Sequence, residues 1–193
     1  VNEPLSINIP WSSFTRQYMV TVSSPVPITL TMHGAPIASG LTVSTWINSS
    51  LTINILVPKY YTFNNDTRLM YKGSNESLVI NSPLSLSISP NSFLRQYFIT
   101  VNSKYPVIIN GTKTTSMANW FNDGEALVVV PATVFSNGVF MSEPGLTINV
   151  NKPQNVTISW SINYMLTLGM YLIIIVVIVI IVIAAYIINK KHH

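Results

Sequence analysis

Few side chains in this sequence could carry out acid–base or nucleophilic chemistry. The chain contains no cysteine, which excludes a thiolate nucleophile and a cysteine metal site. Ahead of the two C-terminal histidines it holds one imidazole, His33, in the turn-like segment MHGAP, where a solvated loop residue is the simplest interpretation. Asp123 and Glu125 are the only closely spaced carboxylates, and the surrounding sequence FNDGEAL predicts an exposed turn.

The sequence also lacks the motifs that catalytic and nucleotide-binding proteins use. It has no HExxH zinc motif, no nucleophile elbow, no calcium loop of known spacing and no glycine-rich phosphate loop. The formal net charge is +4, and Lys190 and Lys191 account for half of it, so no basic surface for nucleic acid is indicated. We predict a protein that is not an enzyme, without metal, cofactor or nucleic-acid partner.

One modification chemistry is well represented, because Asn-x-Ser/Thr sequons are the acceptors of N-linked glycans. None of the sequons in this chain has proline at its middle position. We predict a glycosylated surface protein whose glycans are attached at Asn48, Asn65, Asn75, Asn110 and Asn155.

A repeated phrase contains two of the three arginines of the chain. FTRQYMVTV begins at Phe14, and FLRQYFITV begins 79 residues later, so that Arg16 and Arg95 occupy matching places. Alternation along a strand puts each arginine on the same, core-facing side as the tyrosine two residues later, Tyr18 or Tyr97. We expect a structural role, in which the stem of each arginine covers apolar surface and its guanidinium stays in water. A repeated ligand-docking site is the alternative.

The repeat extends well beyond this phrase. PLSINIP at 4–10 matches PLSLSIS at 83–89, and the segments that begin with Trp46 and Trp120 match with one residue missing. A third copy of the opening, PQNVTISW, occupies 153–160. The chain is therefore predicted to contain two related modules and one terminal strand.

The modules are expected to consist of strands. Short runs rich in valine, isoleucine and threonine alternate apolar with polar residues, as in LSLSIS and LTINVN, between turn residues. The predicted fold class is all-β, with two tandem β-sandwich modules followed by a single C-terminal transmembrane helix. We place the modules at 1–81 and 82–162, the transmembrane helix at 163–189 and a cytoplasmic tail at 190–193.

The membrane segment is the clearest single signal in the sequence. Residues from Leu166 to Ile188 carry no charge, and a helix of this length spans about 35 Å, which exceeds a hydrocarbon core of roughly 30 Å. Lys190 and Lys191 follow directly and predict a cytoplasmic C-terminus by the positive-inside rule. The expected location is the cell membrane, with a single pass and an extracellular N-terminus.

Composition indicates the medium around the extracellular part. Only 8% of the residues are charged, and serine, threonine and asparagine supply the polarity instead. Hydroxyls and amides hardly change with pH, whereas carboxylates lose their charge in acid. The sequence thus suits an acidic medium.

The order RQY-x-(V/I)-T-V-(S/N)-S-x-x-P-(V/I), followed by W-(I/F)-N and V-P, resembles the β-rich repeats of secreted and surface proteins of Sulfolobales, including thermopsin-like proteins. The plan of the chain is also similar to the small membrane-anchored S-layer subunit of those archaea. This resemblance implies tandem β-sandwich domains outside the cell, many glycans and one C-terminal transmembrane helix. The S-layer stalk usually adds a long coiled coil, whereas SWSINYML at 159–166 joins strand to helix here without heptads.

Two functions follow from these features. The first is a structural anchor that holds an S-layer or another extracellular assembly on the membrane, with a surface-layer lattice protein as partner. The alternative is a non-catalytic accessory subunit of a membrane complex, such as a secreted protease, a transporter or a respiratory assembly. Self-association into a homo-oligomer is left open.

Overall fold

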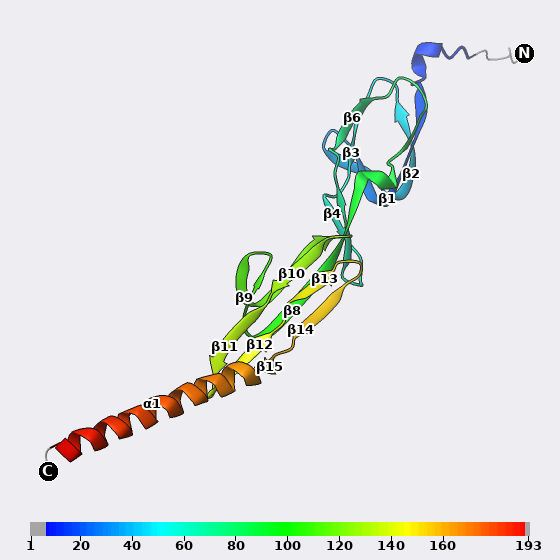
Figure 1. The fold of residues 1–193 in the computed structure, drawn as a ribbon. Helices are drawn as coiled ribbons and strands as arrows, with labels where there is room; N and C mark the ends of the chain where they lie inside the picture. The colour runs from blue at the N-terminus through cyan, green and yellow to red at the C-terminus, as the bar shows by residue number, and fades with distance from the viewer. Residues whose placement is uncertain (1–6, 192–193) are drawn as a thin grey trace, which may run out of the picture. The chain divides into compact units, whose positions relative to one another are not determined.

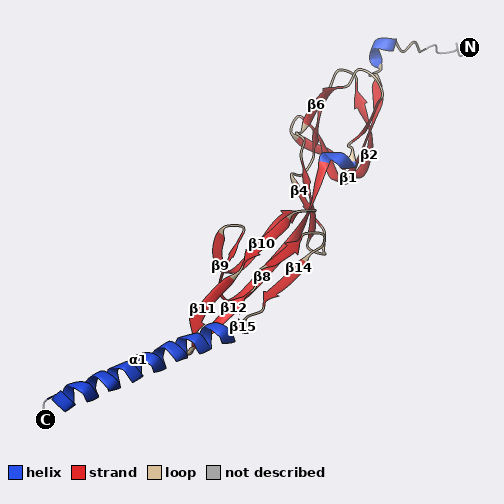
Figure 2. Cartoon of the chain, in the orientation of Figure 1, coloured by secondary structure: helices blue, strands red, loops and turns tan. Residues whose placement is uncertain are grey.

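The chain folds into several β-sheets and one long C-terminal helix, which confirms the predicted β-rich class with a single C-terminal apolar helix (Figures 1 and 2). The computed structural model describes residues 7–191, so the start of the predicted first module and His192 and His193 of the predicted tail lie outside the described residues. The chain divides into two compact units, Val1–Gln96 and Tyr97–His193. The arrangement of each unit as a sandwich stays a prediction.

The first unit is built around one long strand, β1, which forms a hairpin with β2. Strand β3 pairs antiparallel with the end of β1, β6 pairs with β3, and β4 and β5 form a second hairpin. Two short 3-10 helices, η1 and η2, precede β1 and follow β7. The strands are β1 (Gln17–Met32), β2 (Ala35–Asn48), β3 (Thr52–Leu56), β4 (Tyr60–Thr62), β5 (Thr67–Tyr71), β6 (Glu76–Val79) and β7 (Leu84–Ser87), and the 3-10 helices are η1 (Trp11–Ser13) and η2 (Pro90–Ser92).

Strand β7 closes the first unit in an unusual way for a β-rich chain, because it lies parallel to β1. Leu84 lies opposite Val20, and Leu86 lies opposite Val22. The alternating apolar side chains of β7 pack against the core of the unit, whose centre includes Val20, Val22 and Leu30 at 0% exposure. β-branched residues dominate this core because they fit the pleated surface of strands.

The second unit repeats this plan around β8, a strand that begins in the first unit. Strand β8 pairs with β9 and with β10, β10 pairs with β13, and β11 forms a hairpin with β12. The elements are β8 (Phe93–Ile109), β9 (Thr112–Asn122), β10 (Ala126–Val130), β11 (Ala132–Ser136), β12 (Val139–Glu143), β13 (Leu146–Asn149), β14 (Gln154–Ile158), β15 (Ser161–Ile162) and α1 (Tyr164–Lys191).

Strand β14 takes the same place in the second unit as β7 in the first. It runs parallel to β8, with Gln154 opposite Ile99 and Val156 opposite Val101. Since Ile99 matches Val20 at the offset of the sequence repeat, the two parallel pairs have the same register. The repeat in the sequence is thus a repeat of topology as well.

Candidate membrane anchor and extracellular surface

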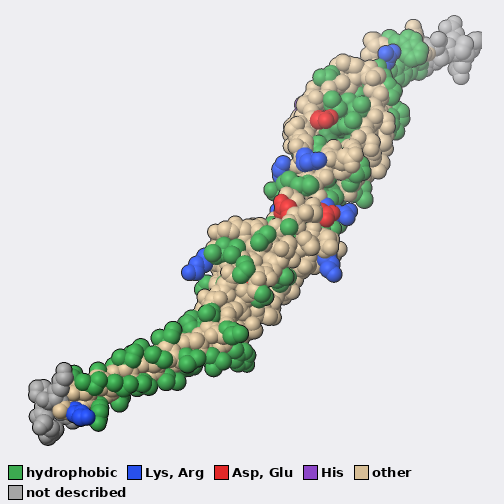
Figure 3. All heavy atoms as spheres, viewed as in Figure 1, with side chains coloured by type: hydrophobic (Ala, Val, Ile, Leu, Met, Phe, Trp, Pro, Cys, Tyr) green, Lys and Arg blue, Asp and Glu red, His purple; other side chains and the backbone are tan. Residues whose placement is uncertain are grey.

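Helix α1 has the dimensions of a membrane-spanning segment. The apolar segment Tyr164–Ile188 is 25 residues long. Its most apolar 18-residue stretch has a mean hydropathy of 3.5, and none of that stretch is buried inside the protein. Such a helix extends about 37 Å at 1.5 Å per residue, which is sufficient for a hydrocarbon core of about 30 Å. The space-filling view shows hydrophobic side chains along the helix and a basic one near its C-terminal end (Figure 3). The single C-terminal helix is therefore long and apolar enough to span a membrane.

The start of α1 is fixed by Asn163. Its side-chain Oδ1 accepts a hydrogen bond of 3.1 Å from the backbone N–H of Leu166, which caps one of the free amides at the helix N-terminus. The same side chain donates through Nδ2 to the hydroxyl of Ser142 in β12, at 3.0 Å. The backbone N–H of Asn163 also donates to the carbonyl oxygen of Phe140, at 2.7 Å. One residue thus begins the helix and attaches it to β12.

Two further side chains attach the helix to the hairpin of β11 and β12. Thr167 is 7% exposed. Its hydroxyl donates a hydrogen bond of 2.8 Å to the carbonyl oxygen of Asn163 and accepts one of 3.0 Å from the backbone N–H of Phe140. One turn later, the hydroxyl of Tyr171 donates to the carbonyl of Gly138 at 2.9 Å. Gly138 has φ = 81°, a conformation that glycine adopts without strain in the hairpin turn. The first two turns of α1 are thus fastened to the second unit.

Sequence patterns did not predict the attachment of the helix to the hairpin of β11 and β12. An asparagine directly before an apolar helical run is an N-cap signal, so the role of Asn163 in starting the helix could have been found. Its bond to Ser142 depends on long-range folding that no local pattern reveals.

The predicted glycosylation sites lie at the surface of both units. Asn65 and Asn110 lie in turns, Asn75 precedes β6, and Asn155 lies in β14, and all four are exposed. Asn48, the last residue of β2, is half-buried. Access of a glycosyltransferase to the four exposed side chains is therefore open in the folded chain.

The hydrogen bonds of these asparagines leave the reactive atom uninvolved. The side-chain Oδ1 of Asn75 accepts from the backbone of Val57 at 3.0 Å, and that of Asn110 accepts from Val128 at 2.8 Å. Asn48 accepts from Gln17 at 2.8 Å, again through Oδ1. A glycan is attached to Nδ2, so these bonds can persist in a glycosylated chain.

The repeated Arg-Gln-Tyr motif has different surroundings in its two copies. Arg16 lies just before β1 and Arg95 lies within β8, and both are exposed. Tyr97 is 8% exposed and belongs to the core of the second unit, whereas Tyr18 is only half-buried. The tryptophans of the repeat also differ, since Trp46 is exposed.

Trp120 in β9 is half-buried, and its ring lies 5.3 Å from that of Phe98 in a tilted aromatic pair. None of these motif residues lines the surface pocket between β8 and the β10–β11 connection of the second unit. The residues common to both copies lie along their strands with different exposure in the two units.

The arginine outside the repeat has the most specific contacts. Nε of Arg68 in β5 donates to Oε1 of Gln96 at 2.7 Å, and its guanidinium carbon lies 4.2 Å from the centre of the Tyr60 ring. Gln96 is 8% exposed. Burial lowers the pKa of the Arg68 guanidinium while Tyr60 raises it, and arginine remains charged at any accessible pH. Sequence comparison between the modules could not have found Arg68, because it is not repeated.

The residues considered for catalysis remain apart. His33 is exposed, with φ = 53°, in the turn between β1 and β2. Glu125 lies in the exposed turn before β10 and accepts two hydrogen bonds from Asn122. Glu143 is 4% exposed, and its Oε2 has no hydrogen-bond partner within residues 7–191. In the described part of the chain no three His, Asp or Glu side chains are grouped closely enough to hold a metal ion.

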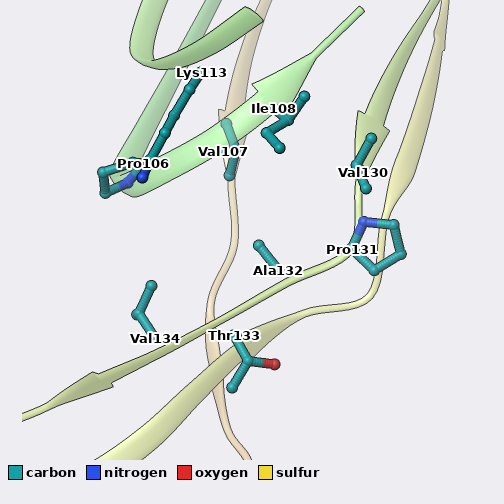
Figure 4. Close-up of a pocket in the computed structure, with 9 residues that line it drawn as sticks. All are labelled: Pro106, Val107, Ile108, Lys113, Val130, Pro131, Ala132, Thr133 and Val134. Atoms are coloured by element: carbon teal, nitrogen blue, oxygen red, sulfur yellow. The ribbon is translucent and has the colours of Figure 1, made fainter. Parts of the chain in front are cut away.

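One surface pocket of about 300 Å³ lies in the second unit, between β8 and the β10–β11 connection (Figure 4). Lys113 and Thr133 are the lining residues with polar side-chain groups, and the others are proline, alanine, valine and isoleucine. The side chains of Lys113 and Thr133 lie apart in this pocket (Figure 4).

Comparison of the chain with protein families, with curated proteins and with solved structures found no match in any of the three.

Proposed function

We propose that this protein is a structural cell-surface anchor, which holds an S-layer or another extracellular assembly on the membrane. The observation that carries the proposal is the fastened base of α1. Asn163, Thr167 and Tyr171 bind the helix to the hairpin of β11 and β12 within its first two turns. A force on the second unit would therefore pass into the membrane helix through several hydrogen bonds and the covalent chain.

The character of the helix supports an anchoring role over a transport role. Between Tyr164 and Ile188 it carries no charged side chain. Ions, protons and polar substrates cross membranes along ionisable or polar groups. An aliphatic helix provides instead a membrane attachment that is effectively irreversible compared with a lipid chain.

The proposed orientation places both β units outside the cell. Lys190 and Lys191 follow the apolar segment, and positive charges favour the cytoplasmic side. The exposed sequons in both units fit an extracellular location, because N-linked glycans are added to exported segments. The resemblance to the small membrane-anchored S-layer subunit of Sulfolobales supports the same assignment.

Deletion of the protein in its host tests the proposal. We expect the surface layer to detach from the membrane while its lattice stays intact, and full-length protein to restore attachment. A matched control replaces residues 164–193 by a stop codon, and this secreted form should not restore it. If the layer stays attached and a membrane enzyme loses activity or assembly instead, the protein is an accessory subunit and the anchor proposal is wrong.

A further inference from the structure

A ten-residue block occurs three times in the chain and has a known place in the fold in only two of them. The copies are VNEPLSINIP at 1–10, INSPLSLSIS at 80–89 and VNKPQNVTIS at 150–159. Each begins with an aliphatic residue, asparagine, any residue and proline, and each continues with isoleucine, leucine or valine at alternate positions. This agreement includes a proline at one fixed place, so it exceeds a shared preference for strand residues.

The second and third copies are the closing strands of their units. Their central residues form β7 and β14, which lie parallel to β1 and β8 in the same register. The aliphatic residue at the head of each block is buried, with Ile80 at 2% and Val150 at 1% exposure. Ile88 packs against the first core, and Ile158 is 4% exposed in the second core.

In the described part of the first copy, residues 7–10, the matching apolar side chains lie outside both cores. Ile7 and Ile9, which match Leu86 and Ile88, are 74% and 60% exposed. Phe14 is 62% exposed, although the matching Phe93 is 8% exposed and contacts the ring of Tyr71. Within the described residues, the segment 7–14 forms hydrogen bonds only inside its own 3-10 turn.

Neither described unit has a vacant place for this segment. The parallel edge of β1 is occupied by β7, and that of β8 by β14. A parallel partner also needs a crossover of roughly a dozen residues or more, and only residues 11–16 separate the block from β1. The segment therefore cannot close the unit into which it leads.

We propose that residues 7–10 belong to the closing strand of a further β module of this plan, whose long strand has an open parallel edge. Addition of a strand to an open sheet edge is an established mode of recognition, in which backbone bonds give affinity and alternate side chains give specificity. Ile7 and Ile9 would enter the core positions that Leu86 and Ile88 occupy in the first unit. Asn8 would face solvent, as Ser87 does.

A second copy of this chain is a poorer occupant than a further module. Its own β7 and β14 are tethered to the edges they cover, and a tethered strand acts at a local concentration in the millimolar range. An incoming strand with nearly the same sequence would have to displace them without a gain in contacts. The inference rests on the proposed function only in placing the further module outside the cell.

A peptide assay on the full chain tests whether this block can close such a module. The variant Leu86→Asp/Ile88→Asp opens the edge of β1, and the peptide VNEPLSINIPWSSF is added to it in detergent solution. We expect the peptide to raise the melting temperature of the variant by several degrees in a saturable manner, while a peptide with aspartate at both isoleucine positions has no effect. The peptide INSPLSLSISPNSF is the positive control. Absence of an effect from VNEPLSINIPWSSF overturns the proposal, whether or not the control peptide acts.

Photo-crosslinking in native membranes identifies the occupant. The full chain carries p-benzoylphenylalanine at position 7 or 9, and crosslinked peptides are sequenced. The proposal expects peptides from a long strand of a β module other than the two described units. Crosslinks to β1 or β8 of a second copy, or to lipid alone, would overturn it. Detachment of the surface layer is not measured in either assay, so failure of the anchor proposal and failure of this inference remain distinguishable.

Discussion

The backbone N–H of Phe140 in β12 donates a hydrogen bond of 3.0 Å to the hydroxyl of Thr167 in the first turn of α1. This bond joins the last strands of the second unit to α1 at a place that is closed to water, since Thr167 is 7% exposed. A buried amide that loses its partner costs about 1–3 kcal/mol. The junction should accordingly be sensitive to the loss of a single oxygen atom.

We predict that Thr167→Val destabilises the second unit by about 1–3 kcal/mol, because valine keeps the shape of the side chain and leaves the amide of Phe140 without a partner. Thermal unfolding of the full chain in detergent, with hydrogen exchange at Phe140, measures the effect. Thr147→Val on the exposed face of β13 is the matched control and should change little. Equal stability of both variants would show that the bond contributes nothing.

Arg68→Ala should destabilise the first unit by about 1–3 kcal/mol, because Gln96 is buried and loses its 2.7 Å partner together with the cation–π contact to Tyr60. Arg95→Ala is the comparison, and an exposed arginine should contribute less than about 0.5 kcal/mol. Chemical denaturation of both variants gives the two values. A larger loss for Arg95 would restore the architectural role that the repeat suggests.

Glu143→Met should raise the stability of the second unit by about 1–2 kcal/mol. An oxygen of this buried side chain has no partner within the described residues, and burial of an unpaired polar group is unfavourable. Methionine fills a similar volume without that cost. Differential scanning calorimetry at neutral pH measures the change, and a fall in melting temperature would mean that the carboxylate has a stabilising partner.

At least three of the five sequons should carry glycans in protein from the native host. The side chains of Asn65, Asn75, Asn110 and Asn155 are exposed. Asn48 is half-buried, so we expect folding to hinder its glycosylation more than that of the other four sites. Intact mass before and after single Asn→Gln substitutions gives the occupancy of each site. A mass equal to that of the bare polypeptide would contradict this prediction.

Removal of Leu166–His193 should release a soluble and folded ectodomain, since both cores consist of residues before this segment. It should unfold at nearly the same temperature at pH 3 and pH 7, because the whole chain has only six carboxylic side chains to protonate. Circular dichroism during heating tests both statements. A transition that falls by more than about 20 °C at pH 3 would contradict the expected resistance to acid.

The strands and the helix could be predicted from local patterns. Alternation in LSLSIS marks β7, and the uncharged run after Met165 marks α1. The offset between the Arg-Gln-Tyr phrases also gave the correct period of the topology. Local patterns suffice here because burial follows a regular period along a strand, and because every turn of a long apolar helix has the same apolar surroundings.

The period did not indicate where one unit ends and the next begins. The repeat in the sequence opens with PLSLSIS at 83–89, yet this segment closes the first unit beside β1, and the units divide at Gln96 and Tyr97. A repeat has the same period whatever its starting point, so only the strand pairing fixes the boundary. The bonds of Arg68 and Thr167 were out of reach for a similar reason, because each joins residues that are far apart in the sequence.

Under the proposed orientation, the parallel pair of β1 and β7 has a consequence for export. If the chain crosses the membrane with its N-terminus first, β1 emerges long before β7, because Val20 precedes its partner Leu84 by 64 residues in the sequence. During that interval the edge of β1 lies open, and Asn48, Asn65 and Asn75 reach the outside before it is covered. Until the unit's own last strand arrives, this unpaired edge would be open to pairing with neighbouring nascent chains.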